Sequence, residues 1–199
     1  MASFIKATII DLIVALFITA IFFVSLKIFL GQEVNLVFEI ANTISINKTD
    51  KPIKENKYDI ENKVLTSYPE YGTQYATIQI PRIDVDLPVY FGDTLDILKK
   101  GVGHSSGSYF PGEGGSIIFM GHNSKKVFRK FSELQKDDEI IVKTGYGEFS
   151  YKIYDMQIVE ETETYKLPIQ QEKEILMIYT CYPFNNIGYT TKRYVVYAN

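Results

Sequence analysis

Two residues in the C-terminal half of this 199-residue chain have side chains suited to nucleophilic catalysis. Cys181, the only cysteine, follows the apolar run EILMIYT, and His122, one of two histidines, follows the run GSIIFMG. A thiolate at one strand end can attack a carbonyl, and an imidazole at another can transfer the proton to the leaving group. The alternatives are a buried apolar cysteine and an ordinary surface or core histidine. We interpret the pair as a nucleophile with its general acid and base.

Arg193 is a third candidate, twelve residues after Cys181 and at the start of the run RYVVYA. If a loop joins the two apolar runs as antiparallel neighbours, Cys181 ends one strand and Arg193 begins the next. Both then lie at the same rim, where a guanidinium can stabilise an oxyanion or hold a substrate backbone. An ordinary surface arginine is the alternative.

Short strand-like runs, rich in β-branched and aromatic residues, dominate the chain from Thr73 onward. Strands are predicted over residues 75–80, 85–91, 115–120, 139–143, 148–159, 174–180 and 193–198. Helical spacing occurs over 93–100, with Asp93 or Thr94 as N-cap, and over 126–134. Many short strands with helices of one or two turns predict a mostly β fold, either an antiparallel sandwich or a closed barrel.

Residues 7–30 are almost wholly apolar, with Asp11 and Lys27 as their only charges. As a helix this run is about 36 Å long and has no polar face, and a bilayer core is about 30 Å thick. We expect an uncleaved transmembrane anchor. A cleaved signal peptide is the alternative, although its apolar region is normally shorter and ends at a small-residue cleavage site. Lys6 precedes the run and no Lys or Arg follows Lys27 until Lys48, which favours a cytoplasmic N-terminus and an extracellular remainder.

The chain therefore divides into three predicted parts. Residues 1–32 are a cytoplasmic tip and membrane anchor, 33–72 a juxtamembrane segment and linker, and 73–199 the catalytic domain. Within the linker, residues 47–72 mix charges, Asn and Pro with few large apolar groups, so they cannot build a core. We interpret them as a stalk, with a solvated helix as the alternative.

Composition excludes several classes of function. The 21 Lys and Arg against 24 Asp and Glu give a net charge of −3, which excludes a polybasic nucleic-acid binder. One cysteine excludes an internal disulfide framework and a multi-cysteine metal site. We expect no cofactor and no metal.

The order His122, Cys181, Arg193 in a small strand-rich domain behind an N-terminal anchor resembles the sortases, the cysteine transpeptidases of bacterial surfaces. The stretches that carry the resemblance are IQIPRIDVDLPVY (78–90), PGEGGSIIFMGHN (111–123) and YTCYPFNNIGYTTKRYVVYA (179–198). The phrase TCYPF, followed by Ile-Gly and Arg-Tyr-Val-Val, is most similar to class D sortases. The family commonly has Thr-Leu-x-Thr-Cys before the nucleophile, whereas this chain has Met177 and Ile178 at the first two positions.

The resemblance implies an eight-stranded closed β-barrel with short helices. It also implies recognition of a Leu-Pro-x-Thr-Gly-like (LPxTG-like) sorting signal near the C-terminus of a secreted protein. Cleavage after the Thr would form a thioester, and an amine of a peptidoglycan precursor would then accept the protein. Carried over to this chain, Cys181 is the nucleophile, His122 the general acid and base, and Arg193 the stabiliser of the oxyanion or the substrate.

The resemblance also implies residues that contact the substrate. Thr180 is expected to bond the acyl carbonyl, and apolar walls over 78–87 and 167–169 are expected to receive the Leu and Pro of the signal. His104 either contacts substrate or is a structural residue of its Gly/Ser loop. Residues 160–173 are expected to line the peptide groove, with their acidic cluster as a solvated loop or, alternatively, as calcium ligands. The candidates are Thr180, Ile80, Leu87, Leu167 and His104, and the acidic cluster is Glu160, Glu161 and Glu163.

Two other classes of function remain as alternatives. One is another cell-wall cysteine peptidase or transpeptidase. An L,D-transpeptidase carries Arg two residues after its cysteine, but here Tyr182 and Pro183 follow Cys181, and wall peptide hydrolases usually place Cys before His. The other is a non-enzymatic anchored binding module, in which Cys181 lies far from His122 and Arg193. The positions of the three residues in space discriminate between the classes.

Overall fold

The structure is a computed structural model that describes residues 14–28, 56–59, 61–62, 64–166, 169, 173–186 and 189–199. An α-helix covers residues 14–28, and large apolar side chains such as Leu16, Phe17 and Phe23 are exposed on it. Within the described ranges, no helix combines the length and apolar character needed to cross a membrane. The anchor expected over residues 7–30 extends at both ends beyond the described residues.

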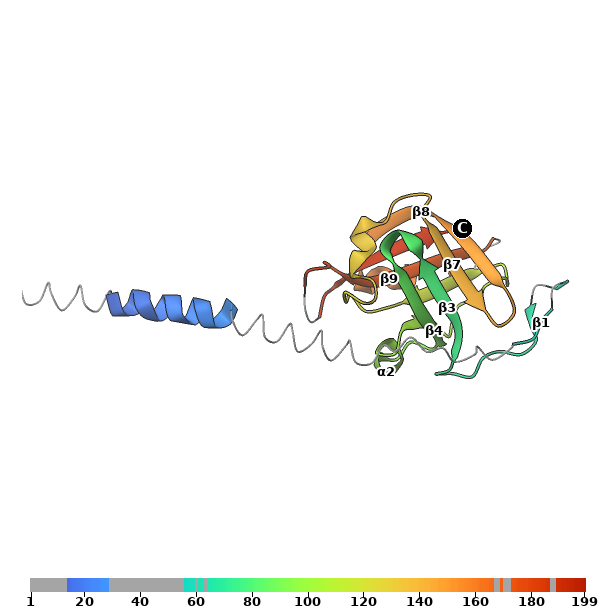
Figure 1. Ribbon diagram of the computed structural model, residues 1–199, viewed down its shortest axis with the longest axis horizontal. Helices are drawn as coiled ribbons and strands as arrows, with labels where there is room; N and C mark the ends of the chain where they lie inside the picture. The colour runs from blue at the N-terminus through green and yellow to red at the C-terminus, as the bar shows by residue number, and fades with distance from the viewer. Residues whose placement is uncertain are drawn as a thin grey trace, which may run out of the picture. The chain divides into compact units, whose positions relative to one another are not determined.

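Eight strands close into a barrel in the order β10-β8-β7-β3-β4-β5-β6-β9 (Figure 1). Only the β4–β5 and β6–β9 pairs are parallel among the pairings of this barrel. Closure removes the free strand edges that would otherwise be open to pairing. The barrel predicted from the sequence is thus confirmed. Its strands are β3 (Gln74–Ile80), β4 (Val85–Phe91), β5 (Val102–His104), β6 (Ser116–Met120), β7 (Glu139–Thr144), β8 (Glu148–Glu160), β9 (Ile175–Tyr182) and β10 (Lys192–Ala198).

The helices between the strands are short. In α2 (Leu95–Leu98) the Thr94 hydroxyl accepts a hydrogen bond from the Ile97 amide at 3.4 Å, which confirms Thr94 as the N-cap. The helix predicted over 126–134 is a 3-10 helix, η2 (Arg129–Glu133). Two further 3-10 helices are η1 (Pro81–Ile83) and η3 (Glu161–Lys166). The sequence pattern does not predict β5, because three residues are too few to show a period.

Side chains of β6, β9 and β10 alternate between two hydrophobic layers. One set, including Phe119, Ile178 and Val196, belongs to the large cluster that draws on every barrel strand and therefore fills the interior. The other set forms a second cluster with Leu98 of α2. Because strand side chains alternate between faces, this second cluster covers the outer face of the three strands. We call it the outer layer, and its members are Ile118, Met120, Ile175, Met177, Val195 and Tyr197, with Val159 and Tyr179 packed against them.

A short hairpin precedes the barrel and packs onto it. Its strands are β1 (Tyr58–Asp59) and β2 (Val64–Leu65). Leu65 is buried in the interior cluster, and the Tyr58 ring stacks on Tyr146 at a centroid distance of 5.2 Å. The interpretation of residues 47–72 as a stalk without core contacts therefore does not hold for this part, because one leucine and one tyrosine suffice to dock a short hairpin. Residues 47–55 lie outside the described ranges.

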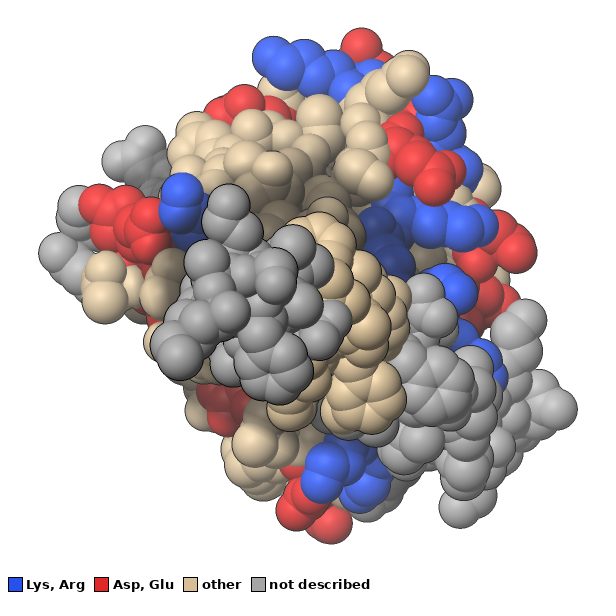
Figure 2. All heavy atoms as spheres, turned by 90° about the vertical axis from the view of Figure 1, so that its left-hand side faces the viewer, with Lys and Arg blue, Asp and Glu red and all other residues tan. Residues whose placement is uncertain are grey.

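Acidic and basic side chains are interspersed on the barrel surface. Figure 2 shows both signs around the margin of the face that it presents. Some of these side chains form exposed ion pairs, such as Lys143–Glu148 at 3.3 Å and Lys192–Glu160 at 3.7 Å. Such exposed pairs stabilise a fold by only about 0–1 kcal/mol each.

His104, at the end of β5, is completely buried among aromatic rings of the interior cluster. Its ring centroid lies 4.5 Å from that of Phe110 and 5.3 Å from that of Phe119. The two ring nitrogens lie 2.8 Å from the Tyr75 hydroxyl and 2.9 Å from the Ser108 hydroxyl. The predicted substrate contact of His104 is therefore not supported, because its imidazole points into the barrel. Its contacts fit the structural alternative.

The burial of His104 predicts a loss of stability in acid. Burial lowers its pKa to about 3, whereas an unfolded histidine titrates near pH 6.5. Between these values the unfolded state binds more protons, so stability falls as pH falls, by up to about 1.4 kcal/mol per pH unit. His104→Gln retains polar groups but does not titrate. Urea unfolding from pH 7 to pH 3.5 should therefore show a shallower acid loss for the variant, and parallel curves for the two proteins would contradict this account.

Candidate active site

Cys181 and Arg193 lie directly opposite each other on neighbouring antiparallel strands, as their spacing predicts. The register pairs Arg193 of β10 with Cys181 of β9. Arg193 is two residues from Val195, and Cys181 is two residues from Tyr179; both of these residues lie on the outer face. Because side chains two residues apart on a strand share a face, Arg193 and Cys181 belong to the outer face too. Opposite Cβ atoms in such a pair are about 4.5–5.5 Å apart. A guanidinium and a thiol thus share one rim.

His122 follows the end of β6 and reaches the same rim through hydrogen bonds to β9. Met120 pairs in parallel with Tyr179, and the Gly121 amide donates to the Tyr179 carbonyl at 3.2 Å. The contact between the two strands therefore continues to the residue before His122, which brings His122 alongside the Cys181 end of β9. The three predicted catalytic residues thus come from the adjacent strands β6, β9 and β10.

Thr180 has a different place from the predicted one. Its side chain is buried on the interior side of β9, and its hydroxyl donates to the Gly121 carbonyl at 2.8 Å. Since it faces away from Cys181, it is not placed to bond an acyl carbonyl on the outer face. It instead anchors the loop that carries His122.

Asn123 ties the other side of the same loop to β9, and sequence reasoning missed this contact. Its side-chain amide donates to the Pro183 carbonyl at 3.1 Å. The Asn123 carbonyl in turn accepts from the Arg129 guanidinium at 3.4 Å. His122 therefore stands between two residues whose links to the Cys181 strand fix the separation of imidazole and thiol.

The environment of His122 favours its neutral form. Burial lowers the pKa of the imidazole, and the positive charge of Lys99 lowers it further. A neutral imidazole can accept a thiol proton. Among the described residues no hydrogen bond joins the side chains of His122, Cys181 and Arg193 directly. Catalytic hydrogen bonds often tighten only when substrate binds.

The Arg193 guanidinium is held on two sides. Nη1 donates to the Thr190 carbonyl at 2.8 Å and to the Lys192 carbonyl at 3.0 Å. Nη2 forms an ion pair with Glu161, and the second carboxylate oxygen of Glu161 accepts from the Tyr189 hydroxyl. The interpretation of Glu161 as part of a solvated acidic loop is therefore incomplete, because its partly exposed carboxylate also pairs with a largely buried cation.

Metal ligation by the acidic segment has no support in these contacts. Glu160 pairs with Lys192, and Glu161 with Arg193. In the part of the chain that the structure describes, no group of three or more His, Cys, Asp or Glu side chains is arranged to hold a metal ion.

The apolar wall predicted over 78–87 does not face the side of the barrel that carries the thiol. Ile80 and Leu87 belong to the interior cluster, with exposures of 0% and 6%, so their side chains face away from the outer face. Leu167 lies outside the described residues. The apolar surface that continues from Cys181 along its own face is the outer layer, where the Tyr179 hydroxyl donates to the Met120 sulfur at 3.4 Å.

Comparison with known proteins gives a consistent result. A family model described as the sortase domain matches residues 78–199. Sortase D of Bacillus subtilis (strain 168) is 40% identical over 144 residues, which are 72% of each chain. The structure of a Clostridium perfringens sortase D5 transpeptidase matches with a TM-score of 0.59 and 30% identity, over 66% of this chain and 81% of that one. Clostridium perfringens sortase C, solved with the C-terminal cell wall sorting motif, matches with a TM-score of 0.58 and 29% identity, over 65% and 71%.

Proposed function

The chain belongs to the sortase family of cysteine transpeptidases, and on this premise we propose that it attaches secreted proteins with an LPxTG-like signal to a peptidoglycan amine. The observation that carries the proposal is the pairing of Cys181 with Arg193 on the outer face of the barrel, beside the loop of His122. This arrangement argues against a binding module with an inert thiol. The similarity to sortase D favours a class D-like enzyme.

In the first half-reaction, the Cys181 sulfur attacks the carbonyl carbon between the Thr and Gly of the signal. The thiol proton passes to His122, and the negative charge that develops on the carbonyl oxygen is stabilised by Arg193. The carbon–nitrogen bond then breaks, and the imidazolium gives its proton to the leaving amine. The products are a thioester at Cys181 and the released C-terminal peptide.

In the second half-reaction, the amine of a cell-wall precursor attacks the thioester carbonyl. His122 accepts the proton that this amine loses, the carbon–sulfur bond breaks, and the Cys181 thiolate leaves and is reprotonated. The carboxyl carbon of the Thr is then joined to the wall precursor by an amide bond. Both steps use the same three side chains.

Placement at the cell surface completes the proposal. Sortases are membrane-associated or extracellular enzymes, and here residues 7–30 serve as a single-pass anchor with the N-terminus in the cytoplasm. The support is the unbroken apolar run in the sequence and the exposed apolar side chains of residues 14–28. The catalytic domain then faces the cell wall.

Intact-mass spectrometry tests the activity. The full chain, in detergent micelles, is incubated with a pool of Leu-Pro-x-Thr-Gly and Leu-Pro-x-Thr-Ala peptides. We expect a mass gain equal to the peptide through its Thr, which an added amine removes with formation of the transfer product. If no peptide forms an adduct and Cys181 also resists a small thiol reagent, the transpeptidase is excluded for this chain.

A further inference from the structure

We propose that Glu161 is the positioning residue of Arg193. Its carboxylate orients the guanidinium on the side of the barrel that carries Cys181, and it connects the start of η3 with the β9–β10 connection. This inference rests on the proposed function. It is carried by the ion pair between Glu161 and Arg193 and by the bond from Tyr189 to the same carboxylate. Arg193 itself was predicted from its spacing to Cys181, whereas its partner was not.

The two terminal nitrogens of the Arg193 guanidinium have different partners. Nη1 is bound to the backbone carbonyls of Thr190 and Lys192, which hold that end of the guanidinium close to its own strand. Nη2 bonds to Glu161, so the plane of the guanidinium is fixed by the carboxylate. The Arg193 side chain is 12% exposed and that of Glu161 39% exposed, so the cation lies deeper and the anion lies on its solvent side. Without Glu161 the guanidinium would keep its contacts to the two backbone carbonyls but would lose the contact that fixes the orientation of Nη2.

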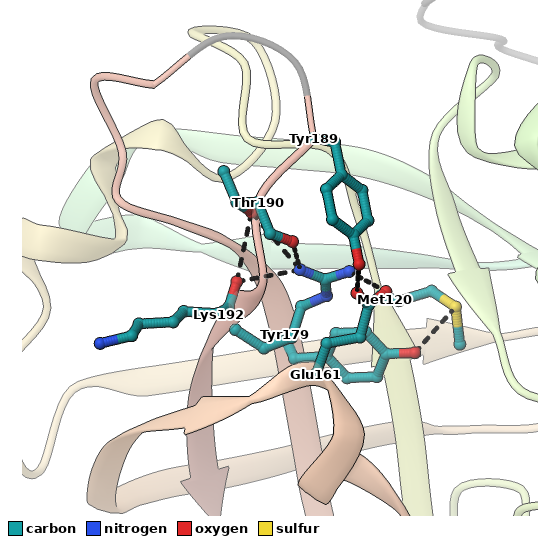
Figure 3. A network of polar contacts seen from close by, with 7 residues as sticks. Met120, Glu161, Tyr179, Tyr189, Thr190 and Lys192 are labelled. Carbon is teal, nitrogen blue, oxygen red and sulfur yellow. Dashed lines mark hydrogen bonds and ion pairs between the residues drawn. The ribbon is translucent and has the colours of Figure 1, made fainter.

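Glu161 also connects two segments far apart in the sequence. Glu161 is the first residue of η3, directly after β8, and its backbone amide donates to the Thr191 carbonyl at 2.6 Å. The Tyr189 hydroxyl approaches the same carboxylate from the β9–β10 connection, and Figure 3 shows the two side chains pointing toward each other. Tyr189 is otherwise 77% exposed. A single carboxylate thus binds the catalytic cation with one oxygen and an exposed loop tyrosine with the other.

Glu161 binds the cation on the side of the barrel where the thiol stands. Its carboxylate pairs with Arg193, which lies opposite Cys181 in the register of β9 and β10. The pKa of the neighbouring Tyr179 responds to the same groups: burial raises it, Arg193 lowers it, and Asp93, Cys181 and Glu161 raise it.

The test compares full-length wild type with Glu161→Gln, in detergent micelles, by the steady-state kinetics of peptide transfer. We expect kcat to fall on the order of tenfold with KM nearly unchanged, because a misaimed cation weakens stabilisation of the transition state rather than binding.

A merely structural role for Glu161 would lower kcat and raise KM together. Glu160→Gln is the matched control, since Glu160 precedes Glu161 and forms an exposed pair with Lys192 at 3.7 Å. It should leave kcat and KM at wild-type values. Glu161→Asp retains the carboxylate, so it should recover part of the lost kcat. Tyr189→Phe should lower kcat less than Glu161→Gln does.

If wild type transfers peptide and Glu161→Gln has the wild-type kcat, the proposal is overturned while the proposed function stands. If wild type forms no acyl-enzyme with any peptide, the proposed function fails and this inference fails with it. Thermal unfolding followed by circular dichroism excludes a folding defect as the cause of a lower rate.

Discussion

Replacement of Cys181 by alanine is expected to abolish formation of the acyl-enzyme and of the transfer product. The sulfur is the atom that bonds the substrate's carbonyl carbon, and no second cysteine exists in the chain to replace it. The other side chains at the rim, a guanidinium and an imidazole, stabilise charge and move protons but do not form the thioester. The residual rate should therefore be indistinguishable from that of peptide without enzyme.

The measurement is intact-mass spectrometry of the protein combined with chromatography of the peptide products. Cys181 is partly exposed at the end of β9, outside the interior cluster, so its truncation leaves the barrel core in place. The melting temperature of Cys181→Ala should accordingly stay close to that of wild type. Cys181→Ser is the graded comparison, because a hydroxyl is a much weaker nucleophile near neutral pH than a thiol. Turnover by Cys181→Ala would remove the thioester from the mechanism.

Apart from β5, the barrel strands were predictable because each shows its apolar pattern within its own residues. Val85–Phe91 is both the predicted and the observed strand β4, bounded by turn residues on each side. Barrel closure could not be read from periodicity alone, because closure depends on pairings such as β6 with β9, which are about sixty residues apart. The family resemblance, rather than periodicity, chose the closed barrel over the sandwich.

The assignment of faces was the weakest part of the prediction. Alternation shows that Ile78, Ile80 and Leu87 share a side, but not whether that side is the interior or an outer groove. The structure places them in the interior, and it places Met120 and Tyr179 on the outer face instead. In a chain where both faces of β6 and β9 are apolar, no contrast in polarity marks the functional face.

The proposed catalytic residues could be chosen from the sequence, but the residues that hold them in place could not. Cys181 and His122 carry rare side chains at strand ends, and that signal needs no tertiary information. Glu161, Thr180 and Asn123 act through partners at least thirty residues away, namely Arg193, Gly121 and Pro183. Their residue types are common, so only the register of β6, β8, β9 and β10 reveals what they hold.

Replacement of His122 by alanine is expected to lower the rate of acyl-enzyme formation by about 10²- to 10⁴-fold. The imidazole is the proposed general base at the rim beside Cys181, and burial together with Lys99 lowers its pKa, which favours the neutral form that can accept a proton. Without it, the thiol must lose its proton to water and the leaving amine must take one from water. Peptide binding should change little, because the proposed role of His122 is to move protons rather than to hold the peptide.

Single-turnover mass spectrometry across a range of peptide concentrations separates the two effects. The expected result is a lower maximal acylation rate with nearly unchanged half-saturation. Added imidazole should partly restore the rate in His122→Ala, because a small base can enter the space that the ring leaves. His104→Gln is the matched control, since it alters the only other histidine, which lies inside the barrel. At neutral pH it should acylate at the wild-type rate, and equal losses in the two variants would point to a folding effect instead of proton transfer.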